Sequence, residues 1–165
     1  MYKRQNISCP NTDDGKCLSD DLESLKNLIL KFRDISPKMI VVKVSPDSTN
    51  EEVLKVCEIL SNISKTAINI GNTKYVKASD VGLSQKTFSK EGGGLSGKSL
   101  YANTLRMVKL VASNYDLPII ATGGVSSYDN VKELLDNGAS LTGMATLLVS
   151  DPFQIPLINY RLSND

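Results

Sequence analysis

The sequence contains no histidine and no tryptophan, and aromatic residues make up only 5% of it. Without histidine, the commonest metal ligand and the commonest neutral-pH base of proteins are both missing, and a zinc site is not expected. Cysteine thiols are then among the few side chains able to exchange a proton near neutral pH. No apolar run approaches the roughly 18–20 residues that span a bilayer.

An excess of charge is also missing: the net charge is +1, and no basic cluster stands out. Nucleic-acid-binding proteins usually carry an excess of positive charge, so we do not expect nucleic acid as a partner. The three cysteines, Cys9, Cys17 and Cys57, are odd in number and lack the spacing of metal ligands. Unpaired thiols are typical of a reducing compartment, so the expected location is cytoplasmic.

What the sequence does contain is a regular alternation of β-rich and amphipathic segments, in a chain long enough for one domain, residues 1–165. The expected strands are residues 3–9, 39–44, 66–70, 117–121 and 140–144. The expected helices are residues 20–32, 48–60, 99–113, 129–137 and 152–162. Ser19 or Asp20 is the expected N-cap of the first helix, and Gly138 closes the fourth. Five strand–helix units predict an α/β fold with a parallel sheet.

In such folds, functional groups gather at the carboxyl ends of the strands. Thr122-Gly-Gly-Val-Ser-Ser127 follows one expected strand, and Met144-Ala-Thr146 ends the next. Two glycines before a helix let backbone amides approach an anion, so this pair of strand ends favours phosphate binding over a simple tight turn. Residues 73–97 form a connection much longer than the usual length of roughly 2–6 residues, which indicates a functional loop.

Three further clusters have both a functional and a structural interpretation. The glycine-rich run of residues 91–98 suits a backbone that passes close to a ligand, or else a flexible linker. Lys43 lies in an apolar strand and needs an anionic or electron-rich partner, unless its ammonium reaches solvent at the strand end. Asn72 and Thr73 offer amide and hydroxyl groups to a planar ligand, or form an ordinary Asx turn.

The run Asn6-Ile-Ser-Cys-Pro-Asn11 places the thiol of Cys9 between two amides at the end of the first strand. A lone cysteine is more often a small buried residue, but this polar context makes Cys9 a candidate nucleophile or base. Together with five later motifs, the run resembles dihydroorotate dehydrogenases. In the order of the family, the later motifs are Lys43 in Val-Val-Lys-Val-Ser-Pro-Asp, Asn72-Thr73, Gly93-Gly-Leu-Ser-Gly-Lys98, Ala121-Thr-Gly-Gly-Val125 and Gly138-Ala-Ser-Leu141.

The resemblance implies a (β/α)8 TIM barrel that binds FMN and oxidises dihydroorotate to orotate in pyrimidine biosynthesis. Cys9 then corresponds to the base that removes the C5 proton of the substrate, while the hydride from C6 passes to FMN. The side chains that would hold the pyrimidine are Asn6, Asn11, Asn72 and Thr73. The cofactor-binding positions would be Asn6, Lys43 beside the flavin ring and, near the ribityl phosphate, Gly97, Gly123, Gly124, Ala145 and Thr146.

The chain departs from the family pattern at several points. A cysteine base is typical of the soluble class 1 enzymes, whereas residues 93–98 resemble the membrane-associated class 2, so the class, the electron acceptor and membrane association stay open. Gly71 stands where the family has threonine, and Leu147 where it often has a small residue. The five units correspond to barrel strands 4–8. The resemblance therefore implies a partial barrel: a fragment, a chain that pairs with a missing N-terminal half or a second copy, or an inactive remnant.

Two other functions fit the same residues. A flavin domain like that of dihydropyrimidine dehydrogenase also uses a cysteine, but as an acid toward uracil. A flavin- or phosphate-binding half-barrel without turnover belongs to a different class, that of interaction modules. The intact set of Cys9, Asn6 and Asn11 favours the two enzymes over the module.

Overall fold

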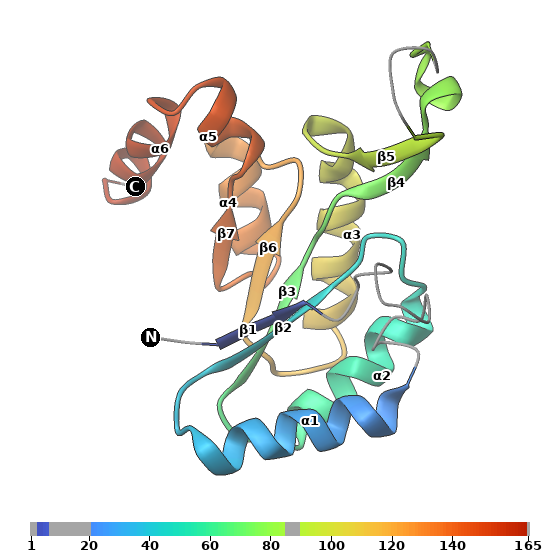
Figure 1. Cartoon of the computed structure of the whole chain (residues 1–165). Coiled ribbons are helices and arrows are strands. Elements are labelled where there is room, and N and C mark those ends of the chain that lie inside the picture. Colours follow the sequence, from blue (N-terminus) through green and yellow to red (C-terminus); the bar gives the residue numbers. More distant parts are fainter. Residues whose placement is uncertain (1–2, 7–20, 85–89, 165) are drawn as a thin grey trace.

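Five parallel strands form one sheet, in which they lie side by side in chain order (Figure 1). The structure is a computed structural model that describes residues 21–84 and 90–164, together with the backbone of residues 3–6. Each strand pairs in parallel with the next, so the predicted parallel sheet is confirmed. The strands are β1 (Lys3–Asn6), β2 (Ile40–Val44), β3 (Thr66–Ile70), β6 (Ile119–Thr122) and β7 (Leu141–Gly143).

Helices connect these strands, and all five predicted helices form. They are α1 (Leu22–Ile35), α2 (Asn50–Ser61), α3 (Tyr101–Ala112), α4 (Tyr128–Asp136) and α6 (Gln154–Leu162). A short helix, α5 (Thr146–Ser150), was not predicted, because five residues are too few to show a helical period. Among the helices that the structure describes, none is long and apolar enough to cross a membrane.

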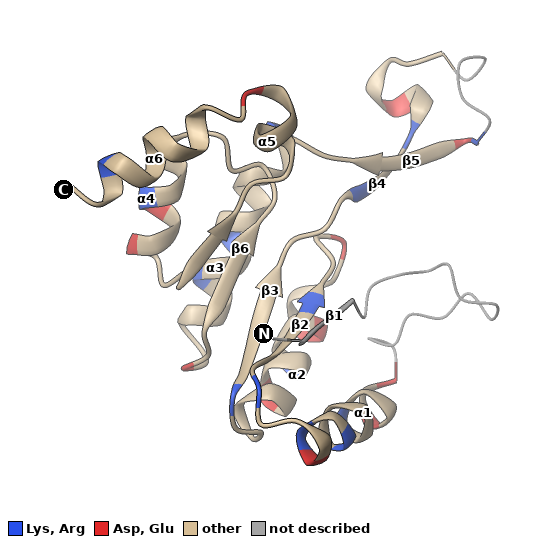
Figure 2. Cartoon of the chain, turned by 60° about the vertical axis from the view of Figure 1, so that its left-hand side comes forward, with Lys and Arg blue, Asp and Glu red and all other residues tan. Residues whose placement is uncertain are grey.

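The long connection between β3 and α3 contains an antiparallel hairpin of β4 (Lys74–Lys77) and β5 (Gly92–Leu95). Figure 2 shows the hairpin projecting beyond the end of the main sheet. The sequence did not predict β5, because three of its four residues are glycine, which is depleted in strands. The glycines allow close packing: a Cβ at Gly94 would lie 2.3 Å from Thr73 Oγ1. The glycine-rich run is therefore part of a strand pair rather than a flexible linker.

Alternation along the strands separates the face that packs against the helices from the opposite face. Ile40, Val42 and Val44 of β2 belong to the buried core, together with apolar residues of the helices. Lys43 points to the opposite face, and the strand register places it beside Asn69 of β3. Because the core lies on the helical side of the sheet, the opposite face corresponds to the inner wall of a barrel.

Short polar residues and one glycine define the helix ends. Asp21 is the N-cap of α1, and its carboxylate accepts a hydrogen bond from Ser24 N at 3.0 Å. The prediction of Ser19 or Asp20 as the cap is therefore wrong, because the helix begins later than its apolar pattern suggested. Gly138 follows α4 with φ 103°, as predicted, since a left-handed residue at this position favours glycine.

Cys57 of α2 packs in the core, and its side chain has no exposed surface. Burial raises the pKa of the Cys57 thiol from 9.0 to about 12. The folded state therefore keeps the thiol proton at pH values where the unfolded chain has released it. The contribution of Cys57 to the free energy of unfolding is complete below pH 9 and is lost as the pH rises. We expect the free energy of unfolding to fall by about 1.4 kcal/mol between roughly pH 8 and pH 10.

Urea unfolding at the two pH values measures this drop, with Cys57→Ala as the control. The variant is expected to be less stable at pH 8, because it leaves a cavity in the core. It should nevertheless lose the part of the pH dependence that comes from Cys57. An equal drop in wild type and variant would show that other groups cause it.

Candidate functional site

A cavity of about 580 Å³ opens where β2, β3, β6 and β7 reach their carboxyl ends. Residues that lead from the hairpin into α3 form another wall, and α5 contributes a third. Pockets of roughly 300–1,000 Å³ hold ligands the size of a cofactor. The polar and glycine-rich clusters of the sequence thus meet at one edge of the sheet, where α/β folds place their sites.

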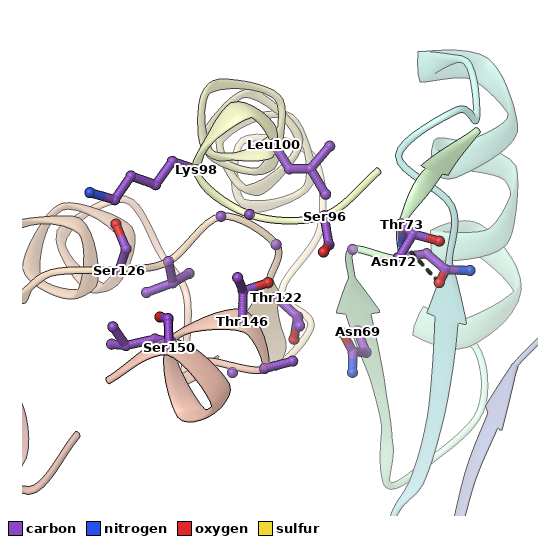
Figure 3. A pocket seen from close by; sticks show the side chains of 18 of the residues that line it. Asn69, Asn72, Thr73, Ser96, Lys98, Leu100, Thr122, Ser126, Thr146 and Ser150 are labelled. Carbon is purple, nitrogen blue, oxygen red and sulfur yellow. Dashed lines mark hydrogen bonds between the residues drawn. The ribbon is translucent and has the colours of Figure 1, made fainter. Parts of the chain in front are cut away.

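The two ends of the cavity differ in chemistry (Figure 3). One end is lined by three hydroxyls and an ammonium, which belong to Ser126, Thr146, Ser150 and Lys98. The other end is lined by two amides and a hydroxyl, which belong to Asn69, Asn72 and Thr73. Such an arrangement suits an elongated ligand with an anionic group at one end and a hydrogen-bonding ring at the other.

Glycines from two separate loops meet at the hydroxyl end. Gly124 has φ 76°, and a Cβ there would lie 2.4 Å from Tyr101 N and 3.0 Å from Gly97 O. The loop after β6 therefore packs directly on the backbone that begins α3, which a larger residue would prevent. Gly97 itself has φ 95°. This close approach leaves backbone, rather than side chains, lining the cavity, as phosphate-binding loops require.

The residues after β7 complete this end. Ala145 and Thr146 both line the cavity, and Thr146 is the first residue of α5. In TIM barrels, a recurring phosphate site is built from the loops after the last two strands and the N-terminus of a short extra helix. The unpredicted helix α5 matches that extra helix in length and position.

Two side chains of α3 hold the loop after β6 and the helix that follows it, α4. The Thr104 hydroxyl is buried and donates to Gly123 O at 2.9 Å, with Leu100 O at 3.2 Å as an alternative acceptor. The Tyr101 hydroxyl donates to Glu133 Oε2 of α4 at 2.6 Å. Burial, and then the neighbouring Glu133 carboxylate, raises the pKa of Tyr101 to about 12, so the hydroxyl stays protonated and keeps donating.

At the amide end, the inner face of the sheet presents Lys43 and Asn69 side by side on β2 and β3. Asn69 is only 1% exposed, and within the described part of the chain its Oδ1 has no hydrogen-bond partner. Asn72 follows at the strand end, where its Oδ1 accepts a hydrogen bond from Thr73 N at 2.9 Å. Asn72 thus makes a hydrogen bond to the next residue and also lines the cavity, while the predicted Asx turn is not observed.

The glycine at position 71, where the family pattern has threonine, has a structural explanation. Its φ is 119°, and a Cβ there would lie 1.4 Å from Thr122 O. The ends of β3 and β6 therefore approach too closely for any side chain at this position. With this backbone, position 71 has no room for a threonine side chain.

Of the predicted site residues, eight line this one cavity: Lys43, Asn72, Thr73, Gly97, Gly123, Gly124, Ala145 and Thr146. Cys9 and Asn11 lie outside the described residues. Asn6 is described by its backbone, which ends β1 and is in register with Lys43. The structure brings the eight lining residues to one edge of the sheet, while their individual roles stay predictions.

Sequence reasoning missed Asn69 and Thr104. Asn69 lies between two isoleucines in a buried strand, and its position beside Lys43 appears only in the register of the sheet. Thr104 lies within a helix, far in sequence from the loop that it holds, so no local pattern could have identified it. Both depend on contacts between separate elements.

The comparisons with known proteins agree with this arrangement. A sequence model of the dihydroorotate dehydrogenase family matches residues 2–164. The chain is 35% identical over 160 residues to dihydroorotate dehydrogenase (quinone) of Actinobacillus pleuropneumoniae serotype 5b, covering 90% of this chain and 46% of the relative. It is 30% identical over 154 residues to the catalytic subunit of dihydroorotate dehydrogenase B (NAD(+)) of Bacillus cytotoxicus, covering 93% and 49%.

A crystal structure of dihydroorotate dehydrogenase from Eimeria tenella, in complex with ferulenol, superposes with a TM-score of 0.72 at 21% identity. It covers 90% of this chain and 45% of that one, which confirms the predicted TIM-barrel fold class for five strand–helix units. The chain thus spans about half the length of the curated relatives that it matches. By its sequence and its fold, the chain belongs to the dihydroorotate dehydrogenase family.

Proposed function

We propose that the chain forms the FMN-binding part of a dihydroorotate dehydrogenase, which oxidises dihydroorotate to orotate in pyrimidine biosynthesis. The observation that carries this proposal is the single cavity with a glycine and hydroxyl end and an amide end. The family membership of the chain supports FMN as the ligand of this cavity. A cytoplasmic location remains the expectation from the unpaired cysteines.

The residues of the cavity fit FMN. At one end, Gly97, Gly124 and Thr146 would hold the phosphate through backbone amides and a hydroxyl, with Lys98 nearby to balance its charge. At the other end, Lys43 would lie beside the flavin ring. When bound, FMN would supply the redox chemistry by accepting a hydride from the substrate.

The remaining roles belong to side chains around the substrate. Asn6, Asn11, Asn72 and Thr73 would bind the pyrimidine through amides and a hydroxyl, which match its ring carbonyls and N–H groups. Cys9 would remove the C5 proton as a general base, a role that the family resemblance supports. The register of Asn6 beside Lys43 brings the start of this segment to the same edge as the cavity.

A complete barrel needs additional strands, which we propose cover both edges of the sheet. β1 and β7 each have one neighbour among the described strands, whereas a TIM barrel closes with eight. Such units would bury exposed apolar side chains of β7, of α5, of α6 and of the N-cap of α6: Leu141, Leu148, Val149, Phe153, Leu157 and Tyr160. A missing N-terminal barrel half or a second copy of the chain would supply them.

Anaerobic reduction of the FMN-loaded protein tests the proposed reaction. We expect dihydroorotate to bleach the flavin absorbance, with one orotate formed for each FMN reduced. Dihydrouracil serves as the matched substrate without the carboxylate, and a preference for it would favour the dihydropyrimidine dehydrogenase-like alternative. Bound FMN that neither compound bleaches would contradict a catalytic function.

A further inference from the structure

We propose that Asn69 recognises the cyclic imide of the flavin, with its side-chain carbonyl accepting the ring N3–H. This inference rests on the proposed binding of FMN and assigns a role to a residue outside the motifs that suggested the family. It makes Asn69 a specificity-determining residue for the flavin ring rather than a packing residue of β3.

The side chain of Asn69 is buried and, in the part of the chain that the structure describes, carries an acceptor without a donor. It is 1% exposed and lines the cavity, yet among the described residues nothing donates a hydrogen bond to its Oδ1. A buried acceptor without a donor is costly, and native structures contain few of them. The neighbouring residues on β3 are apolar, so a leucine would fit the strand pattern better than asparagine. A donor supplied by a ligand in the cavity accounts for the amide.

Asn69 has a charged neighbour across the sheet. Lys43 is its register partner on β2, and both residues line the cavity on the same face. Adjacent strands lie about 4.8 Å apart, so the inner wall here presents an ammonium donor next to an amide acceptor. A cyclic imide offers the complementary pair, a carbonyl oxygen next to an N–H.

The position of Asn69 favours the flavin over the substrate as the source of the imide. Asn72 and Thr73, the proposed substrate residues, come after the end of β3, whereas Asn69 lies within the strand. Lys43, the proposed flavin-edge residue, is level with Asn69. The imide that meets both Lys43 and Asn69 is therefore that of the flavin.

A double comparison of variants and ligands tests this assignment. Wild type and Asn69→Leu are each titrated with FMN and with 3-methyl-FMN, whose methyl group replaces the N3 hydrogen. We expect wild type to bind FMN at least tenfold more tightly than 3-methyl-FMN, and Asn69→Leu to bind FMN about tenfold more weakly than wild type. In the variant, the difference between the two ligands should shrink to less than about threefold.

Thermal unfolding without ligand gives a second readout that is independent of FMN. Asn69→Leu should have an unfolding temperature equal to or above that of wild type, because the orphaned acceptor has been removed. A variant that binds FMN as wild type does, or that weakens only orotate binding, would overturn the assignment of Asn69 and leave the proposed function intact. A folded wild-type protein that binds no FMN would overturn the proposed function and this inference with it.

Discussion

A Cys9→Ala protein is expected to bind FMN normally and to oxidise dihydroorotate about 10²–10⁴ times more slowly than wild type. This is the range that a positioned general base contributes to a proton transfer. With no histidine in the sequence, no imidazole can take over the role of the thiol. Anaerobic stopped-flow measurement of flavin bleaching gives the rate directly.

Cys57→Ala is the matched control, because it removes a second thiol that lies in the buried core. This control should keep the bleaching rate of wild type once circular dichroism has shown that it is folded. Cys9→Ser should retain part of the rate, with its pH profile displaced to higher pH, since a hydroxyl loses its proton less readily than a thiol. Full turnover by Cys9→Ala would remove Cys9 as the base.

Gly124→Ala is expected to weaken FMN binding by at least about 100-fold. The added Cβ would lie 2.4 Å from Tyr101 N, so the loop after β6 must move away from the start of α3. Both segments line the phosphate end of the cavity, and a shift of about 1 Å there would misalign several hydrogen bonds at once. Fluorescence titration with FMN measures the loss.

Gly82→Ala separates this steric effect from the strain of a left-handed backbone. Gly82 has φ 72°, close to the 76° of Gly124, but a Cβ there would meet nothing within 4 Å. Both variants therefore carry the conformational cost of alanine at positive φ, about 1–2 kcal/mol, and only Gly124→Ala adds the clash. Equal FMN affinity in the two variants would contradict the proposed role of the loop after β6.

The centre of the main sheet was predictable from the sequence because its strands are short β-branched runs between amphipathic helices. Residues 39–44 and 66–70 carry this pattern plainly, and both became strands within a residue of the expected bounds. β5 and α5 were not predictable. β5 is made mostly of glycine, and its conformation depends on packing against Thr73 and β4 rather than on its own propensity.

The residues of the site also fall into a group that the sequence could identify and a group that it could not. Gly97, Gly124 and Thr146 could be identified because special residues at strand ends form recognisable local motifs. Asn69 and Thr104 could not, since their importance comes from a neighbour on another element, Lys43 in one case and Gly123 in the other. Gly71 shows a third situation: the sequence revealed the departure, but only the approach of Thr122 O explains it.

Equilibrium titration of the folded wild-type chain with FMN tests the central claim, that the cavity at the carboxyl edge of the sheet is a flavin site. We expect one FMN bound per chain, with a dissociation constant of about 1 μM or lower, and the loss of this binding in Gly124→Ala but not in Gly82→Ala. Folded protein that binds no FMN at roughly 100 μM, or binds it equally well in Gly124→Ala, would contradict it.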